Sequence, residues 1–260
     1  MSDSDTDTTA VLTEARDKVL VITINRPDQR NAVNAAVAQG IGHALDALDA
    51  DDGLVLGVIT GAGKGFCAGM DLKAFTTGER PWFADRGFAG ITRRASAKPL
   101  IAAVEGFAVA GGLEIALACD LIVAARGAKL GIPEVKRSLV ASGGGLLRLP
   151  RVLPRAVAME MALTGDPILA ERAHELGMVN RLAEPGGALE ASLELAAAIA
   201  PNAPLGIIGS KRILNESLDW PDAEFFDRQE AISGPIFDSE DAREGAMAFA
   251  EKRAPVWRGR

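Results

Sequence analysis

The sequence predicts an α/β core followed by a mostly helical C-terminal region. Up to about residue 150, short β-branched runs alternate with helical patterns, which is the order of α/β units. Beyond that point nearly every periodic segment has helical spacing, and only residues 178–182 have the composition of a strand. No low-complexity linker separates the two parts. We therefore expect a loose, disordered tail over residues 1–10, an α/β core over 11–200 and a helical region over 201–260.

The core elements are predicted by their composition and boundaries. Asn31 is a candidate cap for a helix whose apolar side chains recur at helical spacing from Val33 to Leu48. A glycine-rich loop follows at 61–70, then a less regular segment rich in Phe and Arg at 74–96, and a short helix at 112–119. The runs that have the composition of strands are 19–24, 54–60, 99–104 and 121–125. The helices expected beyond them are 154–164, 169–176, 186–200, 204–218, 221–232 and 239–253.

Composition excludes several classes of function. The chain has 48% hydrophobic and 24% charged residues, so a disordered or fibrous protein is excluded. Its net charge of −7 argues against nucleic acid and anionic membranes as partners. The most apolar stretch, 99–125, is interrupted by three acids and is read as core, and the polar N-terminus does not resemble a signal peptide. We expect a cytoplasmic protein.

The scarce residue types limit the available chemistry. There are two cysteines, Cys67 and Cys119, two histidines, His43 and His174, and no tyrosine. The cysteines predict no disulfide framework, and the histidines lie in helical patterns without metal-ligand spacing. We therefore expect no metal, and any catalysis is expected to depend on carboxylates, lysines and backbone groups.

Two glycine-rich segments are candidates for backbone recognition of a ligand. The run Gly61-Ala-Gly-Lys-Gly-Phe-Cys-Ala-Gly-Met-Asp71 fits neither a P-loop nor a dinucleotide fingerprint. It is either a flexible turn or a place where amides approach a ligand oxygen. In Ala108-Val-Ala-Gly-Gly-Leu-Glu114, two glycines open an apolar helix, whose unpaired amides suit a developing oxyanion.

Two glutamates are candidates for acid–base work. Glu114 stands in the first turn of that apolar helix, and Glu134 follows Pro133 beyond the strand at 121–125. Each alone has a structural interpretation, as an acid that favours the N-terminus of a helix. If the helix is buried, the pKa of Glu114 rises and its carboxyl can exchange a proton near neutrality. Together they provide two carboxyls in a chain without suitable histidines.

An ordered set of short motifs extends along nearly the whole chain after Val11. The motifs are Asn25-Arg-Pro27, Phe66-Cys-Ala-Gly-Met-Asp71, Ala110-Gly-Gly-Leu-Glu114, Cys119-Asp120, Gly131-Ile-Pro-Glu134, Leu163-Thr-Gly165 and Gly177-Met-Val-Asn180. Together they resemble the enoyl-CoA hydratase/isomerase (crotonase) superfamily. The resemblance implies a spiral of ββα units with a helical C-terminal region that forms trimers, often paired into hexamers. The hydratase-like branch of that family carries both glutamates.

The resemblance also implies roles for particular residues. The amides of Met70 and Gly111 would polarise the thioester carbonyl of an acyl-CoA, and the two glutamates would add water to a trans-2-enoyl-CoA to give a 3-hydroxyacyl-CoA. CoA arrives as part of the substrate, so no separate cofactor is expected. The residues implied to bind substrate or CoA are Ala68, Met70, Asp71, Leu72, Lys73 and Gly111.

This chain departs from the family pattern in places that leave the reaction open. Ala141-Ser142 stands near the usual Pro-Gly, so Ser142 is a candidate for positioning the reacting water. Val135-Lys-Arg137 and Gly145-Leu-Leu-Arg-Leu-Pro150 are also similar to carnitinyl-CoA dehydratase-like branches. The alternatives to a hydratase are such a dehydratase, an enoyl-CoA isomerase, or a non-catalytic homologue that binds acyl-CoA or RNA.

Overall fold

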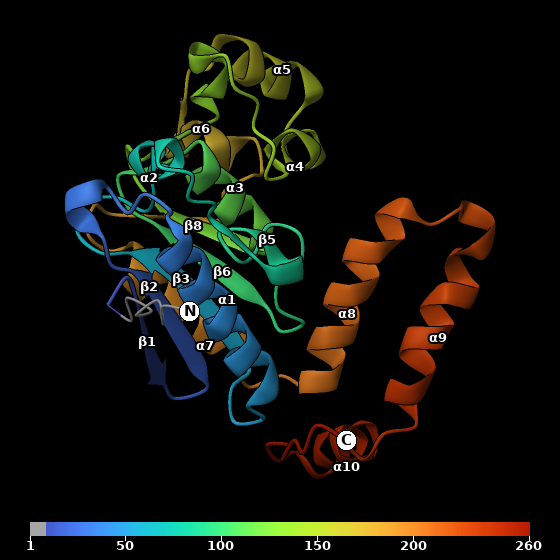
Figure 1. Cartoon of the computed structure of the whole chain (residues 1–260). Helices are drawn as coiled ribbons and strands as arrows, with labels where there is room; N and C mark the ends of the chain where they lie inside the picture. The colour runs from blue at the N-terminus through green and yellow to red at the C-terminus, as the bar shows by residue number, and fades with distance from the viewer. Residues whose placement is uncertain (1–8) are drawn as a thin grey trace.

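A six-stranded sheet organises the protein in the computed structural model, which describes residues 9–260 (Figure 1). The first pair of strands is antiparallel and every other neighbouring pair is parallel. In spatial order the strands are β1 (Val11–Arg16), β2 (Val19–Ile24), β3 (Leu56–Gly61), β6 (Leu100–Val104), β8 (Leu121–Ala125) and β11 (Arg181–Ala183).

Helices cover both faces of this sheet, as a mostly parallel sheet requires. Helix α1 (Ala35–Ala50) packs on β1, β2 and β3, and α7 (Ala188–Ile199) packs on β3, β6, β8 and β11. Successive side chains of one strand therefore enter different cores: Val58 joins the cluster with α7, and Ile59 joins the larger cluster with α1.

A second, smaller sheet lies beside the first and gives the fold its repeat. It consists of β7 (Phe107–Val109), β9 (Lys129–Gly131) and β10 (Ile168–Leu169). Strand β6 leads into β7 and then into α3 (Gly111–Ala118), and β8 leads into β9 and then into the 3-10 helix η3 (Pro133–Arg137). Each turn of chain thus adds one strand to each sheet and then a helix. This confirms the α/β class and the spiral of ββα units.

One predicted helix boundary was wrong. Helix α1 begins at Ala35, and its cap is Asn34, whose Oδ1 accepts a hydrogen bond from the amide of Val37 at 3.1 Å. Asn31 is buried instead, and its Nδ2 donates to the carbonyls of Ala62 and Gly65 at 2.9 and 2.7 Å. The side chain of Asn31 therefore ties the start of α1 to the glycine-rich loop after β3.

The remaining core elements are short and surround the ends of the parallel strands. Those before β6 include a small hairpin, β4–β5, which forms part of the segment rich in Phe and Arg. The elements are η1 (Pro27–Gln29), α2 (Leu72–Thr76), β4 (Trp82–Phe83), η2 (Ala84–Arg86), β5 (Gly87–Phe88), α4 (Gly145–Val152), α5 (Arg155–Thr164) and α6 (Ala170–Glu175).

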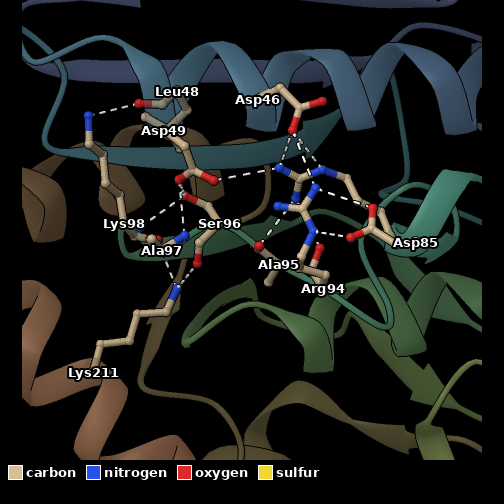
Figure 2. A network of polar contacts seen from close by, with 11 residues as sticks. Asp46, Leu48, Asp49, Asp85, Arg94, Ala95, Ser96, Ala97, Lys98 and Lys211 are labelled. Atoms are coloured by element: carbon tan, nitrogen blue, oxygen red, sulfur yellow. Dashed lines mark hydrogen bonds and ion pairs between the residues drawn. The ribbon is translucent and has the colours of Figure 1, made fainter.

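The C-terminal helices form an arm that extends away from the sheets (Figure 1). Lys211 on the first of them attaches the arm to the core: its Nζ donates to the carbonyls of Ser96 and Lys98 at 2.9 and 2.8 Å and pairs with Asp120 at 2.7 Å. Figure 2 shows Lys211 reaching the segment that carries Ser96 and Lys98. The arm contains α8 (Pro204–Glu216), η4 (Ser217–Asp219), η5 (Asp222–Glu224), α9 (Phe225–Phe237) and α10 (Glu240–Glu251).

Most of the predicted N-terminal tail lies outside the described part of the chain. Residues 1–8 lie outside it, whereas Ala10 is buried and its carbonyl accepts a hydrogen bond from the amide of Asn25 at 2.8 Å. Within residues 9–260, no single helix is long and apolar enough to cross a membrane. Helix α7 with the segment Pro204–Asp219 meets the length and composition test only as a pair bent by 110°.

Candidate active site

The amide of Met70 in the loop after β3 is free, although the backbone around it is fixed. The amide of Val33 donates to the carbonyl of Gly69 at 2.8 Å, and the amide of Asp71 donates to the carbonyl of Val33 at 2.9 Å. These bonds fix the backbone on both sides of Met70, whose own amide has no acceptor among residues 9–260. Gly69 has a φ of +92°, a conformation that glycine adopts without strain.

A second free amide stands at the start of α3, against the same loop. Gly111 is the first residue of this helix, and its amide has no acceptor within the described residues. The two backbones touch: a Cβ on Gly69 would lie 2.9 Å from the nitrogen of Gly111. The free amide of Gly111 also lies at the positive end of the helix dipole.

Glu114 lies in the first turn of α3 and is buried, with 4% of its surface exposed. The amide of Gly145 donates to its Oε1 at 2.9 Å. Burial raises the pKa of Glu114, while the amides of Gly145 and Gly143 and the positive charge of Arg148 oppose that rise. The carboxyl of Glu114 is therefore held in place and can change protonation state closer to neutrality than an exposed glutamate.

Glu134 reaches the same region from η3. Its Oε2 is buried and has no hydrogen-bond partner among the described residues. Burial raises the pKa of Glu134, and the nearby Glu114 carboxylate raises it further. Two carboxyls that influence one another titrate as a pair, and the one without partners is the better candidate to hold the proton.

These groups line one cavity of about 690 Å³. Its aromatic wall comes from Phe75, Trp82 and Phe88, and four arginines, 30, 93, 137 and 148, also face it. A second, apolar cavity of about 470 Å³ shares Glu134, Leu139 and Val140 with the first. Polarising amides, two acids and an apolar wall therefore converge in a space large enough for a small-molecule ligand.

The structure brings most of the expected site residues to this cavity. Ser142 is exposed there. Asp71 and Lys73 do not line the cavity: the carboxylate of Asp71 caps α2 and pairs with Arg26 at 3.0 Å. The expected residues that do line it are Ala68, Met70, Leu72, Gly111, Glu114, Glu134 and Ser142.

Sequence reasoning missed the groups that hold Glu114. They are the amides of Gly143 and Gly145, with the positive charge of Arg148 one helical turn further along α4 as an electrostatic influence. A glycine triplet followed by an arginine three residues later was the available signal. It could not identify Glu114 as the partner, because the contact joins positions 31 residues apart.

The chemistry open to this arrangement is limited by its groups. Two convergent amides can stabilise negative charge on a carbonyl oxygen, and two carboxyls can take and deliver protons next to it. No group of three His, Cys, Asp or Glu side chains suited to a metal ion occurs in the described part of the chain.

The spiral fold with this site defines a class, the crotonase superfamily, and comparison with known proteins agrees. The sequence model of the enoyl-CoA hydratase/isomerase family matches residues 14–260, and the chain belongs to that family. A similar curated relative is enoyl-CoA hydratase EchA19 of Mycobacterium tuberculosis, 42% identical over 258 residues and covering 96% of both chains. A carnitinyl-CoA dehydratase of Salmonella typhi is 43% identical over 252 residues, covering 93% of this chain and 95% of its own.

Solved structures give the same result. Enoyl-CoA hydratase EchA1 from Mycobacterium marinum is 60% identical, has a TM-score of 0.95 and covers 97% of this chain and all of its own. A carnitinyl-CoA hydratase from Mycobacterium avium is 46% identical, with a TM-score of 0.78 and coverage of 97% and 99%. Relatives with these two names support a carbon–oxygen lyase of the crotonase type.

Proposed function

We propose that the protein is an enoyl-CoA hydratase, which adds water to a trans-2-enoyl-CoA and releases a 3-hydroxyacyl-CoA. One observation carries the proposal: two carboxyls, Glu114 and Glu134, line the same cavity as the two free amides of Met70 and Gly111. Addition of water across a double bond requires a base, an acid and a site for the negative charge between the two proton transfers. This cavity contains one of each.

In the proposed reaction the thioester oxygen accepts hydrogen bonds from the amides of Met70 and Gly111. Glu114, as carboxylate, takes a proton from water while the water oxygen bonds to the β-carbon, and the double-bond electrons move onto the thioester oxygen as an enolate. Glu134 then gives its proton to the α-carbon, and the enolate collapses back to the thioester. The hydroxyl group activated by Glu114 and the proton given by Glu134 reach the double bond from the same side, which gives syn addition. Each amide donor is expected to contribute about 2.7–4 kcal/mol.

The proposal also places the rest of the substrate. The CoA part lies along the loop from Ala68 to Lys73, where Leu72 lines the cavity, and the acyl group enters between the aromatic wall and η3. Ser142, exposed beside the glycine turn, is proposed to help position the water. CoA is brought by the substrate, so the proposal includes no separate cofactor. A cytoplasmic location remains a prediction.

The test is a hydration assay with variants of the two acids. Loss of the enoyl-thioester absorbance is followed for the wild type, Glu114→Gln and Glu134→Gln, with Glu160→Gln on the exposed face of α5 as control. Each active-site variant is expected to lose about 10²–10⁴ in kcat, the usual contribution of acid–base catalysis, while its circular dichroism stays native. Unchanged turnover in both would contradict the proposal.

A second candidate is hydration or dehydration of a charged acyl group, as the names of the carnitinyl-CoA relatives suggest. Its chemistry is the same, so the two Gln variants do not separate it from the first. Product analysis over a panel of neutral and charged enoyl-CoAs does, and it also detects an isomerase, which moves the double bond without adding water. Tight binding of CoA esters with no turnover would indicate a non-catalytic homologue.

We further propose that the arm mediates self-association into trimers or pairs of trimers. It exposes large apolar side chains on several helices, among them Phe226 at 75%, Phe237 at 78% and Phe249 at 88%. Apolar surface of this kind is stable in water when a second protein surface covers it.

A further inference from the structure

Arg148 is a half-buried cation beside the two proposed acids. It projects from α4 into the cavity that Glu114 lines. Its Nη2 donates to the carbonyl of Thr92 at 2.7 Å and its Nη1 to the carbonyl of Gly143 at 3.3 Å. No carboxylate within residues 9–260 forms an ion pair with it at 4 Å or less. The guanidinium is thus held by two carbonyls from different segments.

Those two carbonyls connect the wall of the cavity to the support of Glu114. Thr92 belongs to the segment that follows the β4–β5 hairpin. Gly143 belongs to the glycine turn in which the amide of Gly145 donates to Glu114. Gly144 has a φ of +100°, and a Cβ there would overlap Nη1 of Arg148. The guanidinium of Arg148 therefore packs against the backbone of the turn, and moving one would displace the other.

The charged and titratable groups around this contact come from several elements. Glu134 faces Glu114 from η3, Arg151 follows Arg148 on α4, and the thiol of Cys119 lies at the end of α3. Three further arginines, 30, 93 and 137, line the same cavity. Burial raises the pKa of Cys119, so this thiol is neutral. The positive charge of Arg148 lowers the pKa of Glu114 against the effect of burial, so Arg148 favours the ionised form of Glu114.

We propose that Arg148 is a positioning residue for Glu114: by bridging Thr92 and Gly143 it holds the glycine turn on the carboxyl. Its positive charge also favours the carboxylate form of Glu114. The inference rests on the proposed function of Glu114. A structural role alone would give Arg148 an effect on folding but none on the pH dependence of turnover.

The experiment compares Arg148→Met and Arg148→Lys with the wild type. Both kcat and kcat/KM are measured from pH 5 to 9 with an enoyl-CoA that the wild type hydrates, and Arg181→Met, an exposed change on β11 outside both cavities, is the control. Arg148→Met is expected to lower kcat at least tenfold and to move the acid limb of the profile to higher pH, because the carboxyl of Glu114 loses a positive charge that lowers its pKa. Arg148→Lys is expected to keep the limb while kcat falls, because an ammonium group lacks the fork that spans both carbonyls.

Three outcomes would overturn the inference. They are an unshifted acid limb in folded Arg148→Met, wild-type kcat in Arg148→Lys, and a loss of thermal stability in both variants without change in either kinetic measure. If the Met variant fails to fold, the Lys variant decides through its kcat. Glu114→Gln is assayed in parallel. If that variant stays active, the proposed function itself fails, whereas an inactive Glu114→Gln together with any of the three outcomes refutes only the role of Arg148.

Discussion

Gly145 donates its amide to Oε1 of Glu114 at 2.9 Å, so a glycine turn on one side of the cavity fixes a carboxyl that belongs to the helix on the other. The backbone can approach the carboxyl this closely because the turn carries no side chains. A Cβ on Gly145 would lie 3.2 Å from the same oxygen, and one on Gly143 would lie 2.6 Å from Oε2. The position of the proposed base therefore depends on the lack of side chains at Gly143 and Gly145.

Gly143→Ala tests that dependence. The added methyl group must displace the Glu114 carboxylate or the turn, so kcat for hydration is expected to fall on the order of 10–100-fold, the cost of misplacing a reacting group by about 1 Å. Gly206→Ala on α8 is the control, because its nearest neighbour would be an ordinary contact at 3.9 Å. Steady-state kinetics of the two variants decide the question: equal kcat values would contradict the role assigned to the turn.

Met70→Leu tests whether the oxyanion donor at this position is the backbone. If the amide of Met70 does the work, a change of side chain at similar volume leaves kcat within tenfold, whereas loss of a donor costs about 10²–10³. KM is expected to vary with the acyl group, because the thioether lines the cavity. A fall of kcat by 10² or more with a native circular dichroism spectrum would assign the function to the side chain instead.

Local sequence patterns predicted the elements whose own apolar spacing decides which of their side chains are buried. The apolar runs of β2, β3, β6 and β8 and the periodicity of α7 and α8 were sufficient, since burial of those side chains depends on local spacing. Strand β1 was missed because four of its six residues are exposed, which leaves no apolar alternation to detect. The helix cap was assigned to Asn31 because the tertiary bonds that occupy its side chain join distant segments.

The same distinction applies to the site. Glu114 and the amide of Gly111 follow from the sequence around them, because a glycine pair before an apolar helix places both within one turn. The support of Glu114 does not, because the amide of Gly145 and the charge of Arg148 act on it from a distant part of the sequence. Asp71 shows a structural role that the motif did not indicate: its side chain caps α2.

Lys211→Met is expected to loosen the arm from the core. Its side chain is 12% exposed, and its ammonium group has three oxygen partners: the carbonyls of Ser96 and Lys98, drawn in Figure 2, and the carboxylate of Asp120. The methionine leaves all three without this donor. The expected loss of stability is about 1–3 kcal/mol. Limited proteolysis is expected to cleave near α8 earlier than in the wild type, and Lys18→Met, an exposed change near β1, serves as control. Proteolysis at the wild-type rate would contradict the anchoring role.

The proposed self-association predicts a solution mass three or six times the 27.1 kDa of one chain, measured by light scattering coupled to gel filtration. Phe237→Asp on the arm is expected to reduce that mass, because it places a charge in the apolar interface. Leu12→Asp, a similar change on an exposed residue of β1, is expected to leave the mass unchanged. A single species of 27.1 kDa at all concentrations would contradict the arm's assigned role.

Glu134→Gln is expected to stabilise the protein at neutral and alkaline pH although it lowers kcat. The pKa of Glu134 is raised above its ordinary value of 4.5, so the folded state binds a proton that the unfolded chain has already released. The stability of the wild type therefore falls as pH rises from about 4.5 through the raised pKa, and the full cost persists above it. Glutamine carries no charge, and the variant avoids this loss.

Thermal unfolding between pH 4 and 8.5 measures the difference. The variant and the wild type are expected to have similar melting temperatures at pH 4 and to separate in favour of the variant as pH rises, by about 2–4 °C for each kcal/mol. Glu160→Gln, which changes an exposed glutamate, is expected to follow the wild type throughout. A difference in melting temperature that is constant with pH, or that favours the wild type at pH 8, would contradict the prediction that the buried Glu134 carboxylate destabilises the folded protein.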